Sequence, residues 1–275
     1  MKIGIRAHDL GRGNFEQFEE NIRRISNIGY DSIQLAPAKC INEIDGIPSL
    51  TEEQAHRIKV ILDRHHISVS VLGCYLDFTS SDAKIRKKAK ETFIQYIRYA
   101  KLLEADMIAT ETSYGVITEE NREQAMSYVR EAFADIIPIA EQEEVLVVIE
   151  PVATHALNTP NRTRDLIDHF SSDYFKILYD QTNLLTVDMM DQDDGMFERV
   201  IRNFGSDVKA IHVKNFVVCN GEKQMVAIED GIVDMKRILS YAKQHWPDAV
   251  LIREDPAGAD IERDYQYITH ILALT

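Results

Sequence analysis

Short apolar runs alternate with longer amphipathic segments from one end of the chain to the other. The run VLVVIE, residues 145–150, sets five aliphatic residues in a row, which is typical of a strand buried on both faces of a parallel sheet. The pattern predicts eight strands, at residues 2–7, 32–36, 68–74, 107–112, 145–150, 175–180, 208–215 and 249–254. It predicts a helix after each strand, at residues 15–28, 51–65, 82–103, 119–143, 161–170, 188–203, 233–245 and 260–273.

Eight strand–helix units in 275 residues are the number found in a (β/α)8 barrel, the TIM barrel, which is the predicted fold. The competing architecture is a doubly wound open sheet, whose first strand is usually followed by a glycine-rich phosphate-binding turn. The segment AHDLGRGNF has two glycines at the wrong spacing for that turn, so the barrel is favoured. No linker or change of composition marks a boundary, and residues 1–275 are predicted to form a single α/β domain.

Two of the predicted helices carry local signals. In the segment TEEQ, residues 51–54, Thr51 is expected to cap the N-terminus of the helix that follows. Pro138 lies inside the segment 119–143, where it predicts a kink or a break because proline lacks the N–H of a helical hydrogen bond.

Charge and composition argue against several classes of partner. The formal net charge is −14, and a field of that sign repels nucleic acids unless a local basic patch opposes it, which the chain does not offer. No run reaches the roughly 18 apolar residues of a membrane-spanning helix, and the N-terminus has no secretory signal pattern, so we expect no membrane association. Three scattered cysteines are typical of free thiols in a reducing cytoplasm. The pattern leaves the oligomeric state open, a homo-oligomer included.

Polar residues stand at the ends of the last four predicted strands. They are Glu150, Asp180, His212 and Glu254. The active site of a TIM barrel lies at the carboxyl ends of its strands, so these side chains are expected to converge at one mouth. Each shares a strand face with the residue two positions before it, and those residues are apolar, as a barrel interior requires. They are Val148, Leu178, Ala210 and Ile252.

Three carboxylates in one water-poor space repel one another unless a cation holds them. Three oxygen donors and one imidazole nitrogen suit a divalent ion, with Mn²⁺, Mg²⁺, Co²⁺ and Zn²⁺ as candidates. A single carboxylate at a strand end is commonly a helix cap or a surface group, and only the series of four points to a shared site. We therefore interpret Glu150 as a metal ligand, because a lone buried carboxylate would be costly.

Other polar residues near strand ends are candidates for substrate binding. His8, Tyr75, Glu111, His155 and Lys214 belong to this group, although each also has a structural interpretation. Lys214 shares the strand face of His212 and either meets a substrate hydroxyl or phosphate or forms a buried salt bridge to a carboxylate. Arg253 faces away from Glu254 by strand alternation and is expected to pair with a helix.

Five motifs run in order through the second half of the chain: VVIEP, ILYDQTN, AIHVKN, AIEDGIVD and LIRED. Together with VLGCYLDF and MIATETSYG, they resemble the xylose isomerase-like barrels of the sugar phosphate isomerase/epimerase superfamily, which includes ketose 3-epimerases, hydroxypyruvate isomerase and inosose-processing enzymes. The resemblance implies a small polyhydroxylated carbonyl substrate and one divalent metal, often manganese. It implies the same four ligands, and it implies that Glu150 and Glu254 act as an acid/base pair across the reacting carbon.

Two departures from that pattern leave the reaction open. Many members have a substrate-contacting histidine three residues after the metal aspartate; this chain has Asn183 there, which we keep as a substrate-binding candidate. The epimerases also have an arginine shortly after the metal histidine, and HVKNFVVCN contains none. Proton return to the opposite face would give epimerisation, and return to the adjacent carbon would give isomerisation. An inosose-type dehydratase on the same site is a further alternative.

Two alternatives belong to another functional class. Apurinic endonucleases of this fold hold three zinc ions with additional histidines, but this chain has Asn183 at one such position, and the segment MVAIEDGIVD has no histidine. The net charge of −14 also disfavours DNA binding. The other alternative is a non-catalytic sugar-binding barrel, against which the presence of both Glu150 and Glu254 argues.

Overall fold

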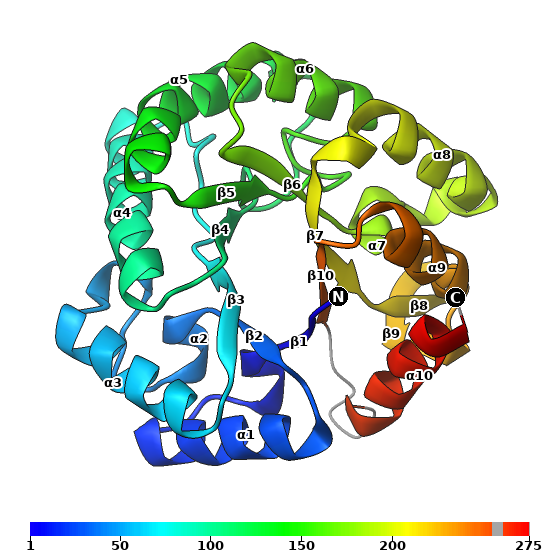
Figure 1. Ribbon diagram of the computed structural model, residues 1–275. Coiled ribbons are helices and arrows are strands. Elements are labelled where there is room, and N and C mark those ends of the chain that lie inside the picture. The colour runs from blue at the N-terminus through cyan, green and yellow to red at the C-terminus, as the bar shows by residue number, and fades with distance from the viewer. Residues whose placement is uncertain (255–260, 275) are drawn as a thin grey trace.

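A closed barrel of parallel strands forms the centre of the structure (Figure 1). The computed structural model describes residues 1–254 and 261–274 and, for residues 190–194, the backbone alone. Strand order around the barrel is β1-β10-β7-β6-β5-β4-β3-β2, and neighbouring strands are parallel. The strands are β1 Ile3–Arg6, β2 Ser32–Leu35, β3 Ser68–Gly73, β4 Met107–Thr110, β5 Leu146–Ile149, β6 Phe175–Tyr179, β7 Val208–Val213 and β10 Val250–Arg253. The predicted (β/α)8 barrel is confirmed.

Helices surround the barrel on its outside (Figure 1). The longer ones are α1 Phe15–Ile28, α3 Glu52–Arg64, α4 Ala83–Leu102, α5 Glu119–Glu143, α6 Pro160–Phe170, α8 Asp193–Phe204, α9 Met235–His245 and α10 Ile261–Leu274. Short helices, α2 Pro37–Cys40 and α7 Gln181–Leu184, follow β2 and β6. The predicted cap is confirmed, since Thr51 and Gln54 form a reciprocal capping box at the start of α3. Helix α8 begins later than predicted because a 3-10 turn, η3 Val187–Gln192, precedes it.

Alternation along the strands separates two apolar layers. One set of side chains packs outward against the helices, and a smaller cluster gathers residues from six strands in the barrel interior. The interior cluster contains Val71, Met107, Ala109, Val148, Leu178, Ala210, Val250 and Ile252. All four residues predicted to face inward belong to it, so the side chains two positions further along these strands point into the mouth.

Pro138 does not break its helix. α5 continues from Glu119 to Glu143, and of the two expected outcomes the break is wrong. Proline removes one helical hydrogen bond, but buried side chains on both sides of it, including Phe133, Ile137 and Ala140, keep α5 packed on the barrel.

A two-stranded antiparallel hairpin, which the hydrophobic pattern does not predict, follows β7. β8 Asn215–Cys219 pairs with β9 Glu222–Val226, so the strand predicted over 208–215 ends at Val213. The turn residues Asn220 and Gly221 have φ angles of 53° and 80°. Two positive φ angles are required by the type I′ hairpin turn, for which Asn-Gly is the usual sequence. That dipeptide is the signal that could have revealed the hairpin.

None of the helices in the described part of the chain combines the length and the apolar character needed to cross a bilayer.

Candidate metal centre at the barrel mouth

The last four barrel strands carry the predicted ligands to one end of the barrel. Glu150 and Asp180 directly follow β5 and β6, and His212 is the next-to-last residue of β7. Glu254 directly follows β10. Asp180 is fixed locally because it caps α7, where its Oδ1 accepts the backbone N–H of Asn183 at 2.9 Å.

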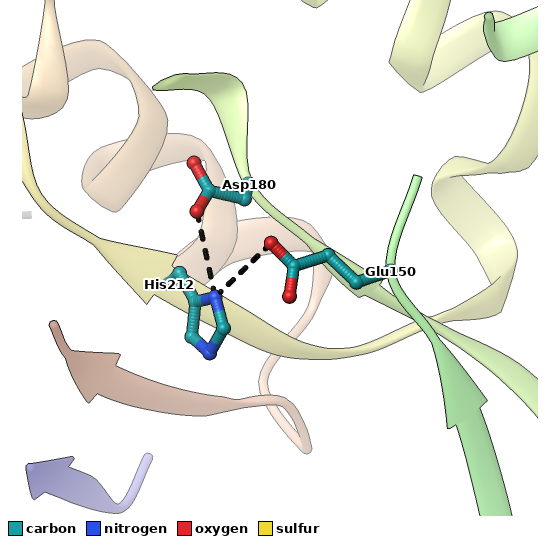
Figure 2. A group of neighbouring side chains, drawn as sticks. All are labelled: Glu150, Asp180 and His212. Carbon is teal, nitrogen blue, oxygen red and sulfur yellow. Dashed lines mark ion pairs between the residues drawn. The ribbon is translucent and has the colours of Figure 1, made fainter. Parts of the chain in front are cut away.

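Three of these side chains form a compact buried group, and Figure 2 shows them pointing toward one another. One ligand atom from each of Glu150, Asp180 and His212 lies within 4.8 Å of the other two. His212 Nδ1 is 3.4 Å from Glu150 Oε1 and 3.4 Å from Asp180 Oδ2. Glu254 approaches the same nitrogen with Oε2 at 2.6 Å. The three predicted carboxylate ligands therefore surround Nδ1 of the fourth predicted ligand, His212.

Three buried atoms of this group make ion-pair contacts but no regular hydrogen bond: Asp180 Oδ2, His212 Nδ1 and Glu254 Oε2. Buried polar atoms are rarely left in this condition, and a bound ion is one explanation of the exceptions. Carboxylate oxygens and an imidazole nitrogen are donors that divalent cations accept, and Glu150 adds a further oxygen. The residues present thus fit one divalent cation.

Burial and neighbouring charges push the two glutamates in opposite directions. Burial raises the pKa of Glu150, even though the His212 imidazole acts against it. Burial also acts to raise the pKa of Glu254, but His212, Lys214 and Arg6 outweigh it and hold that pKa well below its ordinary value. Burial acts to lower the pKa of His212, but Glu254 and Glu150 outweigh it and raise that pKa well above its ordinary value. Without a metal the site therefore holds an imidazolium among carboxylates, a positive charge in the place that a cation would take.

Two further cations contact the carboxylates. Lys214 forms the buried salt bridge, one of its two expected roles, with Nζ 2.8 Å from Asp180 Oδ2 and 3.3 Å from Glu254 Oε1. Arg6, the last residue of β1, places Nη1 2.6 Å from Glu254 Oε1 and also pairs with Asp9. Arg6 is not among the predicted site residues, although the strand-end rule that finds the other four applies equally to KIGIRA.

Asn183 and Glu111 lie beside the ligand group, and His155 contacts Glu111. Asn183 Nδ2 donates a hydrogen bond to Glu150 Oε1 at 2.6 Å, so Asn183 contacts a predicted ligand directly. Glu111 follows β4, and its Oε2 lies 3.4 Å from His155 Nδ1. Burial, reinforced by Glu150 and other carboxylates, raises the pKa of Glu111 to about 8. Burial lowers the pKa of His155.

Tyr75 and His8 come from the first strands of the barrel. Tyr75 Oη accepts a hydrogen bond from Gln34 Nε2 at 2.7 Å, and Gln34 Oε1 lies 2.8 Å from His212 Nε2. Gln34 is not among the predicted site residues, and its only signal is its position as a polar residue in the middle of the strand SIQLA. His8 lies in the 3-10 helix η1 Ala7–Leu10, where its Nδ1 is buried without a hydrogen bond. Burial, with the Arg6 charge, lowers the pKa of His8 to about 3.

The side chain of Arg253 points away from the barrel mouth, as strand alternation predicts. Its Nε donates to Asp264 Oδ2 at 2.8 Å, and Asp264 lies on α10. The expected pairing of Arg253 with a helix is confirmed.

Comparison with known proteins agrees with this fold. The family model described as a xylose isomerase-like TIM barrel matches residues 22–270. A D-tagatose 3-epimerase-like protein superposes with a TM-score of 0.79 at 15% identity, covering 100% of this chain and 98% of that chain. A xylose isomerase-like TIM barrel protein from Mycobacterium smegmatis in complex with magnesium gives 0.75 at 15% identity, covering 100% and 96%. D-psicose 3-epimerase in the presence of D-fructose gives 0.71 at 17% identity, covering 100% and 98%. At identities this low, the superpositions show a shared fold and nothing more. The comparison with curated proteins finds no match.

Proposed function

Because the chain belongs to the xylose isomerase-like TIM barrel family, we propose that it is a divalent-metal-dependent isomerase or epimerase of a small polyhydroxylated carbonyl compound. The observation that carries this proposal is the convergence of Glu150, Asp180 and His212 within 4.8 Å, with Glu254 2.6 Å from the imidazole. A set of buried donor atoms of this composition supports a single cation. Mn²⁺ is the favoured ion, and Mg²⁺, Co²⁺ and Zn²⁺ are the alternatives.

A bound divalent cation would polarise a substrate carbonyl and so acidify the neighbouring C–H. We assign removal of that proton to Glu150, because a carboxylate whose pKa is raised by burial is a better base near neutral pH. Asn183 holds one oxygen of this carboxylate through its 2.6 Å hydrogen bond. Glu254 is the second member of the acid/base pair, and its carboxylate lies 2.6 Å from the imidazole of the same ligand group.

The charges at the mouth favour an uncharged substrate over a phosphate ester. Lys214 and Arg6 already contact the Glu254 carboxylate, so their charges are largely compensated within the protein. His8 Nδ1 and His155 Nδ1 make no hydrogen bond, and burial lowers the pKa of both imidazoles. Neutral imidazoles suit sugar hydroxyls, whereas a phosphate binds best to uncompensated cations and helix N-termini.

Solvent exchange tests the proposal. The protein, loaded with Mn²⁺ in D₂O, is incubated with a panel of ketoses and polyol ketones and with the phosphate esters of the same ketoses. Deuterium should enter the carbon next to the carbonyl of at least one free ketose, and EDTA-treated protein should show no exchange. Exchange confined to phosphate esters would overturn the choice of an uncharged substrate. Exchange in no compound would favour the non-catalytic sugar-binding barrel or a dehydratase.

The number of metal ions separates this proposal from the nuclease alternative. Elemental analysis of protein purified without chelator should find one divalent ion per chain, whereas the endonuclease reading requires about three zinc ions. A preparation that contains no metal and takes up no Mn²⁺ would overturn the metal-dependent proposal.

A further inference from the structure

A buried amide connects the two sides of the barrel mouth. Gln34, on β2, is 1% exposed, and it lies between the imidazole of His212 on β7 and the phenol of Tyr75. Its Oε1 is 2.8 Å from His212 Nε2, and its Nε2 donates to Tyr75 Oη at 2.7 Å. Both contacts have ordinary hydrogen-bond lengths, so the side chain is held at both ends.

The surroundings of His212 decide which nitrogen carries the proton in a metal-bound site. Nδ1 faces Glu150, Asp180 and Glu254 at 2.6 to 3.4 Å, so Nδ1 is the atom available to a cation. A neutral imidazole that offers Nδ1 as an electron pair must carry its hydrogen on Nε2. A hydrogen at Nε2 requires an acceptor, and Gln34 Oε1 stands at that position.

We propose that Gln34 is a positioning residue that holds His212 in the Nε2–H tautomer, with Nδ1 directed at the divalent cation, and that Tyr75 anchors the Gln34 amide in this orientation. The inference rests on the proposed function, because it assumes that His212 binds the metal. Metal-binding histidines commonly donate their second N–H to such a partner, and loss of the partner typically lowers metal affinity 10- to 100-fold.

The anchor gives the amide its direction. If the amide were reversed, its NH₂ group would face the Nε2–H of His212, and two donors would oppose each other. With the amide as it stands, Gln34 accepts from His212 and donates to Tyr75 Oη, so neither contact pairs two donors. Removing the phenol hydroxyl leaves Gln34 Nε2 without this acceptor and frees the amide to rotate.

Titration of Mn²⁺ into EDTA-stripped protein, followed by calorimetry, tests the assignment through metal affinity alone. Gln34→Met keeps the size and charge of the side chain but removes the acceptor, and its Mn²⁺ affinity should fall 10- to 100-fold. Gln34→Glu restores an acceptor at the same position, and its affinity should equal or exceed that of the natural chain. Tyr75→Phe should weaken Mn²⁺ by a smaller factor, about 2- to 5-fold.

Ser32→Ala is the matched control. Ser32 is fully buried on the same strand two residues earlier, and its hydroxyl makes no hydrogen bond. Its removal should leave Mn²⁺ affinity unchanged.

Each outcome separates this inference from the proposed function. If the natural chain binds no Mn²⁺, the proposed function fails and this inference fails with it. If the natural chain binds Mn²⁺ and Gln34→Met binds it equally well, only the role of Gln34 is wrong. Should Gln34→Met fail to fold, Gln34→Glu decides: a tenfold loss of affinity in that variant would overturn the role, because a merely structural amide would not be replaced by a carboxylate without cost.

Discussion

The two sides of the barrel mouth differ in how their buried polar groups are compensated. On the side formed by β5, β6, β7 and β10, three buried atoms have no hydrogen bond and are surrounded by ion pairs. On the side formed by β2 and β3, the facing groups Gln34 and Tyr75 are neutral and hydrogen-bonded to each other. Buried charges need a counter-charge, whereas neutral groups need only a partner of matching polarity. Substitutions on the first side should therefore change metal-dependent activity and stability more than substitutions on the second side.

The largest effect is expected from the carboxylates of the charged side. Glu150→Gln and Glu254→Gln keep the size of the side chain but remove the base, so turnover at saturating Mn²⁺ should fall by about 10²- to 10⁴-fold. Asp180→Asn should differ in kind, because its function is to hold the ion, and excess Mn²⁺ should recover much of its activity. Steady-state kinetics over a Mn²⁺ series compares the three.

Two results would change this division. If Asp180→Asn stays inactive at saturating Mn²⁺, Asp180 does more than hold the ion. If either glutamine variant keeps near-normal turnover, that glutamate is a ligand only.

Lys214 supplies the next largest effect. Its removal in Lys214→Met leaves Asp180 and Glu254 short of positive charge inside the protein, which should cost about 3 kcal/mol of unfolding free energy without metal. Saturating Mn²⁺ should reduce the loss, since the cation replaces the missing charge. Urea denaturation with and without Mn²⁺ measures both values. Lys2→Met, which removes an exposed salt bridge to Asp106, is the control and should cost less than about 1 kcal/mol. An equal loss with and without Mn²⁺ would mean that Lys214 and the metal do not share a site.

Metal binding should stabilise the natural chain by a comparable but smaller amount. A ligand that binds only the folded state at 100 times its dissociation constant adds about 2.7 kcal/mol. For a chain of this size that corresponds to a Tm rise of several degrees. Differential scanning calorimetry of EDTA-treated protein, before and after Mn²⁺ addition, measures the rise. If Tm does not rise on Mn²⁺ addition, the charged groups of this side are structural ion pairs and do not bind a metal.

The smallest effect concerns Glu111, whose pKa is raised to about 8 in the folded protein. A carboxyl with a raised folded pKa is compatible with folding at low pH and destabilises the fold as pH rises from its ordinary pKa of 4.5 toward 8. Because 28% of the Glu111 side chain is exposed, solvent screens much of this effect. Metal-free Glu111→Gln should therefore be more stable than the natural chain at pH 8, by on the order of 1–2 kcal/mol, and equal to it near pH 4. Urea denaturation across this range measures the difference. A difference that grows toward low pH would contradict the burial-driven shift.

The fold could be predicted from the local sequence pattern, because apolar residues recur differently in the buried strands of a parallel sheet and in amphipathic helices. The failures come from interactions that a local rule does not weigh. Pro138 is a helix breaker in isolation, but the packing of Phe133, Ile137 and Ala140 overrides it. The hairpin after β7 is set by its Asn220–Gly221 turn rather than by hydrophobic alternation.

The candidate site divides in the same way. A strand-end rule finds Glu150, Asp180, His212 and Glu254 because each lies at a position that the barrel geometry makes equivalent. It does not reveal that Arg6 contacts Glu254, since 248 residues separate them and only the closure of the barrel brings them together. The contact of Gln34 with His212 spans 178 residues and depends on which side chains face each other across the mouth.

Closure of the barrel also has a consequence for synthesis. β1 pairs with β10, with Ile3 opposite Leu251, so β1 is synthesised long before one of its two neighbours in the barrel (Figure 1). Until that strand emerges, the nascent sheet has two open edges, and open edges are sites of incorrect pairing between chains. Contacts of such long sequence separation also slow folding, because a large loop must close before they form. The pairing of β1 with β10 that brings Arg6 to Glu254 thus delays completion of the candidate metal centre until β10 has been synthesised.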